Sequence, residues 1–189
     1  MESENTVTSY NLVKLPASSD IPMEQLRMPA DSSLSHEGQM LTFVEPHFAL
    51  REGESVDMKL IEEQVAPAME IGCVGGMCPH ISFTSLRKHA EEGNPEVVTI
   101  RFNENDKNDA THYRLYYDDA ARLKRRPLNT RANEFIRMST NSKKNQSPTE
   151  PNDESTVLIY GDVLIFQLGN GKLLSLSPKD VEQKMASYK

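Results

Sequence analysis

The segment Ile71–Ala90, with the sequence IGCVGGMCPHISFTSLRKHA, brings together more special residue types than any other part of the chain. It contains both cysteines of the protein, two of its five histidines and the pair Gly75-Gly76. Glycine pairs of this kind break regular structure. We therefore expect a strand that ends at Gly72, a turn-rich connection, and a polar turn over Ser85–Glu92 that contains His89.

Short runs of β-forming residues flank this segment on both sides. The clearest are Glu96–Asn103 and Thr111–Tyr117, which surround a polar turn and predict a hairpin. Gln39–Pro46 and Phe135–Met138 predict further strands, and Thr156–Ser177 predicts a late group of strands around a glycine-rich turn. About seven or more short strands indicate a mostly β fold, an antiparallel β-sandwich or a small barrel.

Polar segments flank and interrupt the predicted β domain, which covers residues 39–177. Residues 1–38 are rich in Ser, Glu, Asp and Pro, and their few apolar residues follow no sustained period. Such a segment buries too little apolar surface to offset its ordering entropy, so we expect a disordered tail. Residues 139–155 contain no apolar side chain, and we expect a disordered insertion there.

Two segments indicate helical structure. Residues 178–189 predict a C-terminal helix that begins after Ser177 and places Val181 and Met185 on one face. This helix could cover a sheet edge or mediate self-association. The segment Val56–Val65 fits either a strand or a short helix.

Overall composition limits the class of function. The chain has 189 residues, of which 37% are hydrophobic, with a net charge of -7 and a mean hydropathy of -0.58. A chain this acidic is not, as a whole, an electrostatic binder of nucleic acid. No apolar run approaches the roughly 18 residues of a membrane-spanning helix, and two cysteines do not make a disulfide framework. We expect a soluble protein of the nucleus or cytoplasm that needs no cofactor and contacts no membrane.

The cysteines and histidines of the central segment allow other interpretations. Cys73, Cys78, His80 and His89 are four potential ligands, which satisfies tetrahedral zinc in number. Their spacing differs from that of common zinc modules, because a single residue separates Cys78 from His80. A cysteine near a histidine can also act as a nucleophile, but the sequence shows no nucleophile elbow and no acid placed to orient a base. We expect no metal and no enzyme activity, with a small zinc-binding module as an alternative.

The order of the motifs resembles that of a forkhead-associated (FHA) domain. Ile71-Gly72, then Ile81–Phe83 and Leu86–Ala90 before the strand VVTIRF, are similar to the early part of that family. Leu158–Phe166, with the sequence LIYGDVLIF, is similar to its late Gly-Asp turn. The resemblance covers about residues 39–177. It implies a two-sheet sandwich of the FHA and SMAD type, no catalytic activity, and phosphothreonine peptides bound by loops at one end.

The same resemblance implies a set of phosphate-binding residues, at which this sequence is degenerate. Cys73 stands where the family has Arg, and Leu86 stands where it has Ser, so a fixed charge and a hydrogen-bond donor are missing. Neighbouring basic and polar residues could replace them, which gives the candidate phosphopeptide-binding set Ser85, Arg87, Lys88, Arg131 and Asn133. Gly72 and His89 are implied to be structural, because the family's histidine braces its loop.

These observations predict a non-enzymatic protein-interaction module that resembles an FHA domain and acts as a scaffold in a larger complex. Its partner is a protein, in phosphorylated form if phosphothreonine recognition survives the two replacements. A pleckstrin-homology-like interaction domain is an alternative, because Thr156–Tyr188 reads as a β-rich body closed by one helix. The basic cluster Leu123–Pro127 fits a solvated loop, a phosphate patch or a nuclear import signal.

Overall fold

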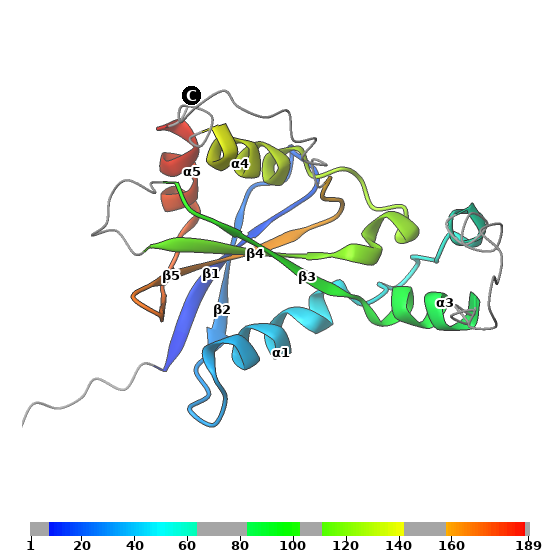
Figure 1. Ribbon diagram of the computed structural model, residues 1–189, viewed down its shortest axis with the longest axis horizontal. Helices are drawn as coiled ribbons and strands as arrows, with labels where there is room; N and C mark the ends of the chain where they lie inside the picture. The colour runs from blue at the N-terminus through cyan, green and yellow to red at the C-terminus, as the bar shows by residue number, and fades with distance from the viewer. Residues whose placement is uncertain (1–7, 64–82, 103–110, 142–157, 188–189) are drawn as a thin grey trace, which may run out of the picture.

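The computed structural model describes residues 8–63, 83–102, 111–141 and 158–187. Their strands form one antiparallel six-stranded sheet in the order β2-β1-β5-β4-β3, with β6 paired to β5 (Figure 1). The strands are β1 (Ser9–Leu15), β2 (Glu24–Pro29), β3 (Pro95–Ile100), β4 (His112–Asp118), β5 (Val163–Gly169) and β6 (Lys172–Leu174). The helices are α1 (His36–Phe48), α3 (Phe83–Glu92), the 3-10 helix η1 (Asp119–Lys124), α4 (Thr130–Asn141) and α5 (Pro178–Ala186), and residues 58–63 are also helical.

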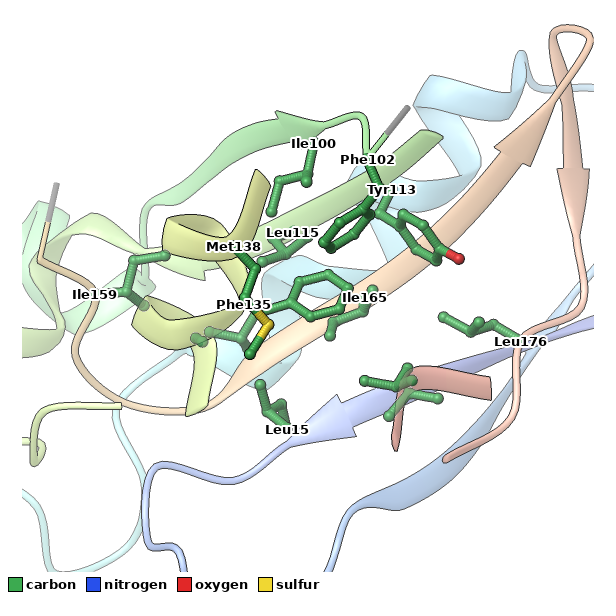
Figure 2. Close-up of a cluster of buried hydrophobic side chains, with 14 residues drawn as sticks. Leu15, Ile100, Phe102, Tyr113, Leu115, Phe135, Met138, Ile159, Ile165 and Leu176 are labelled. Carbon is green, nitrogen blue, oxygen red and sulfur yellow. The ribbon is translucent and has the colours of Figure 1, made fainter. Parts of the chain in front are cut away.

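Helices cover both faces of this sheet. Side chains of β5 alternate between two apolar clusters, so this strand is buried on both sides. The cluster under α4 and α5, shown in Figure 2, includes Leu15, Leu115, Phe135, Ile165 and Val181. The cluster under α1 includes Leu12, Met40, Val44, Phe48, Leu164 and Phe166. The antiparallel sheet predicted from the sequence is confirmed, but in the described part of the chain helices lie where a sandwich would have its second sheet.

The N-terminal residues correct one prediction. Residues 1–38 are predicted to be a disordered tail, but within them Ser9–Leu15 and Glu24–Pro29 form β1 and β2. β1 lies inside the sheet, between β2 and β5, and Leu12, Val13 and Leu15 are fully buried. Because this strand buries neighbouring residues on opposite faces, its apolar residues do not follow the alternation of a half-buried strand. The structured body therefore begins before residue 39.

Residues 39–46 correct a second prediction, because they belong to α1 and not to a strand. Met40, Val44 and Phe48 are buried and recur every four residues, which places them on one helix face. Ser35 caps the helix, and its hydroxyl accepts the Gly38 N–H at 3.1 Å. The helical period and the cap outweigh the β propensity of Thr42, Phe43 and Val44.

Two further segments are helical where the sequence predicts other structure. The polar turn predicted over Ser85–Glu92 lies in α3, whose exposed surface carries pairs Arg87–Glu91 and Lys88–Glu92 with the i, i+4 spacing of a helix. The strand predicted over Phe135–Met138 lies in α4. Asn129 starts α4, because its Oδ1 accepts the Ala132 N–H at 2.9 Å.

Other predictions are confirmed. β3 and β4 form the predicted hairpin pair, and β5 and β6 pair on either side of the turn at residues 169–171. α5 begins with a capping box between Ser177 and Asp180, and the side chain of Val181 in this helix is buried. No helix among the described residues has the length and apolar character needed to cross a bilayer. Most of the predicted insertion 139–155, and the predicted strand end at Gly72, fall outside the described residues.

Candidate functional site

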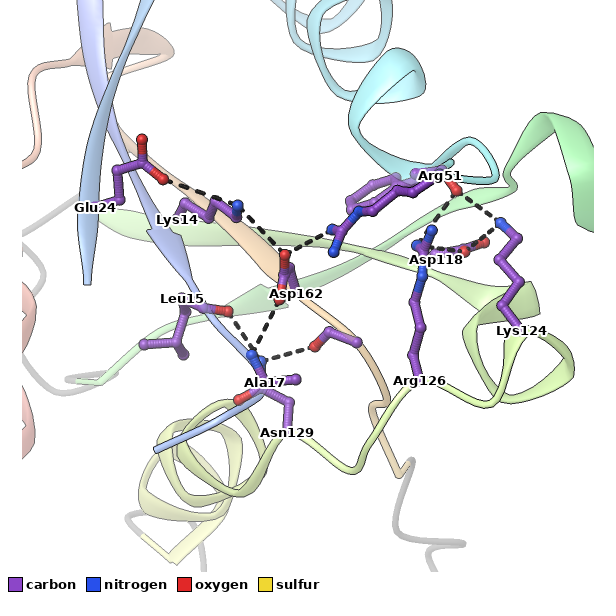
Figure 3. Close-up of polar contacts among 12 residues, drawn as sticks. Lys14, Leu15, Ala17, Glu24, Arg51, Asp118, Lys124, Arg126, Asn129 and Asp162 are labelled. Carbon is purple, nitrogen blue, oxygen red and sulfur yellow. Dashed lines mark hydrogen bonds and ion pairs between the residues drawn. The ribbon is translucent and has the colours of Figure 1, made fainter. Parts of the chain in front are cut away.

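The C-terminal end of α1 is held by two buried cations. Lys124 Nζ donates to the Phe48 carbonyl at 2.6 Å, and Arg126 donates to the Phe48 and Ala49 carbonyls at 3.3 and 2.9 Å. The last carbonyls of a helix lack partners within it and carry the negative end of its dipole, so cations stabilise them. These contacts fix where the chain leaves α1, and Figure 3 shows Lys124 and Arg126 beside Asp118.

Asp118 provides the compensating charge for the two cations. Its Oδ2 accepts from Lys124 Nζ at 2.6 Å and from Arg126 Nη1 at 3.2 Å, and its Oδ1 accepts the N–H groups of Asn94 and Ala120, both at 3.1 Å. Burial lowers the pKa of Lys124, and the hydrogen bond to Asp118 opposes that shift. The carboxylate thus joins β4, η1 and the end of α1.

Glu54 extends this network to the loop that follows α1. Its carboxylate accepts from Arg126 Nε at 3.1 Å and Arg126 Nη2 at 2.8 Å, and also accepts the Arg51 backbone N–H at 2.8 Å. Two-point pairing of a guanidinium with a carboxylate fixes orientation as well as distance. The hydrogen bond from Arg126 holds the pKa of Glu54 below its usual value. The buried side chain of Arg126, which is distant in the sequence, therefore positions the backbone of Arg51 through Glu54.

Arg51 and Lys14 meet at a single carboxylate. Arg51 Nη2 donates to Asp162 Oδ2 at 2.7 Å, and Lys14 Nζ lies 3.4 Å from the same oxygen. The other oxygen, Oδ1, accepts the Ala17 N–H at 3.1 Å. Burial alone would raise the pKa of Asp162, but the hydrogen bonds from Arg51 and Ala17 and the charge of Lys14 lower it. Asp162 is thus an ionised carboxylate shared by two cations (Figure 3).

Asn129 sets the position of Asp162. Its Nδ2 donates to the Leu15 carbonyl at 3.0 Å and to the Gly161 carbonyl at 2.9 Å, which ties the end of β1 to the turn before β5. Gly161 has a φ of +73°, and a Cβ there would lie 3.1 Å from Arg126 Cδ. The turn that presents Asp162 is therefore built around a glycine and a fully buried amide.

A small pocket opens beside these charges, and we call it the Lys14–Arg51 pocket. It has a volume of about 190 Å³ and is lined by Lys14, Pro46, His47, Phe48, Arg51, Asp162 and Leu164. Two of its lining side chains are cationic and one is anionic, while Pro46, Phe48 and Leu164 form an apolar wall. Burial, and then the charges of Lys14 and Arg51, lower the pKa of His47, so its imidazole is neutral at pH 7.

The residues predicted as a phosphopeptide site do not form one cluster. Ser85, Arg87 and Lys88 lie in α3, whose Ala90 packs with Ile61 and Leu123, whereas α4 packs on the sheet with Phe135. Arg87 Nε donates to Glu91 at 2.8 Å, and Lys88 lies 3.6 Å from Glu92. These two cations are thus already paired on an exposed helix surface.

The α4 candidates serve the fold. Arg131 donates to the Ser19 carbonyl, and to the Ile21 carbonyl at 2.7 Å. Asn133 Nδ2 donates to the Asn129 and Ile159 carbonyls at 2.7 and 3.1 Å, and its Oδ1 accepts the Ile159 N–H at 3.0 Å. Both side chains hold neighbouring loops against the start of α4.

The predicted structural and metal-binding residues are only partly described. His89 lies on the exposed surface of α3, while Gly72, Cys73, Cys78 and His80 fall outside the described residues. Within residues 8–63, 83–102, 111–141 and 158–187, no three Cys, His, Asp or Glu side chains are grouped in a way that could hold a metal ion.

The residues of the Lys14–Arg51 pocket were not among those predicted from the sequence. They come from β1, the end of α1, the following loop and the turn before β5, so no local spacing links them. Of these positions, only Asp162 lies in a segment singled out from the sequence, the Gly-Asp turn that resembles the late turn of the FHA family. Comparison with protein-family models, with curated proteins and with solved structures finds no match to this chain.

Proposed function

We propose that the protein is a non-enzymatic interaction module that binds a phosphate group of a protein partner in the Lys14–Arg51 pocket. The observation that carries this proposal is the convergence of Lys14 and Arg51 on one carboxylate at the wall of a small pocket. Cations that share a single counter-charge inside a recess attract an anion more strongly than dispersed surface cations do.

The charges that line the pocket favour an anionic ligand. Asp162 neutralises one of its two cations, so the lining keeps one positive charge in excess when His47 is neutral. Glu24 also lies 3.8 Å from Lys14, but it is 57% exposed, and exposed ion pairs are weak. Arg51 uses Nη2 for Asp162, while its Nε and Nη1 have no hydrogen-bond partner among the described residues. A guanidinium with free N–H groups is the side chain best suited to phosphate oxygens.

The size of the pocket limits the ligand. Its volume of about 190 Å³ is smaller than the roughly 300–1,000 Å³ of pockets that bury a whole small molecule. A phosphate group fits in such a space, while the molecule that carries it remains outside. We therefore favour a phosphorylated side chain of a protein over a nucleotide. The FHA resemblance suggests the same class of ligand, but this binding mode needs neither the family's loop positions nor its two-sheet body.

The test is a titration of serine- and threonine-phosphorylated peptide libraries against the full chain. We expect phosphorylated peptides to bind and their unphosphorylated forms not to bind. Arg51→Gln should weaken binding roughly tenfold or more, since a charge-assisted hydrogen bond contributes about 1.5–3 kcal/mol. Arg87→Gln on α3 makes the same change of charge at a site away from the pocket, and it should leave the affinity unchanged.

Either of two results would overturn this proposal. One is a folded protein that binds no phosphorylated peptide. The other is binding that Arg51→Gln and Lys14→Met leave intact while Arg87→Gln abolishes it, which would move the site to α3. Circular dichroism spectra of each variant establish that it is folded.

A further inference from the structure

His47 occupies the wall of the Lys14–Arg51 pocket without a polar partner among the described residues. It lies in the last turn of α1 and is half-buried. Its ring packs on Phe43 of the preceding turn, with 5.1 Å between ring centroids. This contact holds the imidazole at the pocket. A neutral imidazole has a single N–H donor, whose position depends on the tautomer, whereas the protonated ring has two N–H donors.

Charged groups surround this imidazole from every neighbouring element. Lys14 comes from β1, Arg51 from the loop after α1, Asp162 from the turn before β5, and Glu24 from β2. Burial, and then the charges of Lys14 and Arg51, make a positive imidazolium unfavourable at His47, while Glu24 opposes them. An arriving anion would reverse that balance, because it adds negative charge where the two cations now dominate.

We propose that His47 is a third ligand of the bound anion and takes up a proton as the anion enters, so that the pocket selects dianions over monoanions. This inference rests on the proposed function and deepens it. With neutral His47, the lining carries one excess positive charge, which a monoanion neutralises completely. A dianion leaves one negative charge over, and the imidazolium neutralises it. Proton uptake by His47 therefore accompanies the binding of a phosphate dianion or a sulfate, and does not accompany the binding of a singly charged ester.

Linkage gives this inference a measurable form. If an anion raises the proton affinity of His47, protonation of His47 must raise the affinity for that anion by the same factor. A tenfold coupling corresponds to a rise of about one unit in the His47 pKa. The proton comes from solvent and goes to a ring nitrogen of His47, and no covalent bond other than this N–H forms.

The probes are sulfate, which stays doubly charged between about pH 6 and pH 8, and methyl sulfate, which stays singly charged there. Calorimetry on the full chain should show sulfate binding severalfold tighter near pH 6 than near pH 8, because the full gain of about tenfold is reached only well below the His47 pKa of the free protein. Methyl sulfate should bind with little pH dependence. NMR titration of the histidine ring signals should show the His47 pKa rising when sulfate is added.

His47→Gln tests the assignment, because glutamine can donate a hydrogen bond but takes up no proton. We expect this variant to bind sulfate equally at both pH values, near the affinity of the wild type at the higher pH. The matched control is His36→Gln, which changes the other half-buried histidine of α1, whose Nδ1 lies 3.2 Å from the Gly171 carbonyl. That control should keep the wild-type pH dependence.

The outcomes separate the two proposals. Sulfate binding that depends on Arg51 but not on pH, with an unchanged His47 pKa, would overturn the role of His47 and leave the phosphate-binding function standing. Failure of the folded protein to bind sulfate at either pH would remove the anion site, and the proposed function with it. The NMR titration of the wild type decides the question even if His47→Gln does not fold.

Discussion

Lys124 donates from Nζ to the carbonyl of Phe48 at 2.6 Å, and its side chain is fully buried although it carries an ammonium group. The two residues are 76 positions apart in the sequence. This contact, with the parallel one from Arg126, determines where α1 ends and hence where the Lys14–Arg51 pocket lies. The position of the pocket therefore depends on the buried charges of Lys124 and Arg126, which are not among its lining residues.

Asp118→Asn should destabilise the protein strongly. The substitution keeps the shape of the side chain but leaves Lys124 and Arg126 buried with less counter-charge. Removing one partner of a buried ion pair costs about 3–5 kcal/mol, which urea denaturation would measure as a lower free energy of unfolding. Arg125→Gln is the control, because its guanidinium is largely exposed in the pair with Asp57 and its loss should cost much less. Equal effects of the two variants would contradict a structural role for the buried cluster.

Replacing Asn129 should reveal two separate contributions. Asn129→Ala removes both the cap on the Ala132 N–H and the donor to the Leu15 and Gly161 carbonyls. Each buried group left without a partner costs about 1–3 kcal/mol, so we expect a loss of at least about 2 kcal/mol. Asn129→Ser keeps a capping oxygen and should recover about 1 kcal/mol of that loss. If the Asn129→Ala and Asn129→Ser variants have the same melting temperature, Asn129 does not act as a cap.

Gly93 and Gly171 form a matched pair for testing the close contact at the end of α1. Both have positive φ, +86° and +74°, so alanine strains the backbone at either position. A Cβ on Gly93 would lie 2.7 Å from the Phe48 carbonyl carbon, whereas a Cβ on Gly171 meets nothing within 4 Å. Gly171→Ala should cost about 1–2 kcal/mol, and Gly93→Ala should cost clearly more. Similar melting temperatures for the two variants would show that the backbone near Phe48 shifts at little cost to make room for the added Cβ.

Stability should fall as the solution is acidified. The pKa values of Glu54 and Asp162 in the folded protein lie below their ordinary values of 4.5 and 3.8. A carboxyl group with a lowered folded-state pKa stabilises the fold above its unfolded pKa, and this stabilisation is lost as pH falls through the folded pKa. Urea midpoints should therefore drop below about pH 4. Glu54→Gln should be less stable than the wild type at neutral pH and should lose less stability on acidification. An identical acid profile for Glu54→Gln would contradict the contribution of the Arg126–Glu54 pair.

Some elements were predictable because their signal is local. The β3–β4 pair has the alternation of a hairpin, and Ser177 and Asp180 mark the start of α5 as a capping box. The β-forming residues of Gln39–Pro46 favour a strand when taken alone, but the four-residue spacing of Met40, Val44 and Phe48 makes the segment part of α1. β1 was missed because a strand buried on both faces shows no alternation.

The candidate site could not have been derived from the sequence. Lys14, His47, Arg51 and Asp162 are brought together only by the pairing of β1 with β5 and by the packing of α1 on the sheet. The positions of Arg51 and Asp162 further depend on Glu54, Arg126 and Asn129, which are buried polar side chains with no distinctive sequence spacing. The resemblance to the FHA family stays a prediction, and the phosphopeptide-binding residues that it implies lie on α3 and α4.

The strand order has a consequence for synthesis on the ribosome. β1 is translated before β2, β3 and β4, and its inner neighbour β5 follows all of these strands in the sequence. Until β5 arrives, the edges of β1 and β4 lack the strand that joins them, and nascent chains with open edges of this kind aggregate. Truncation shortly before Val163 should therefore give an insoluble product, whereas removal of residues after Ala186 should not.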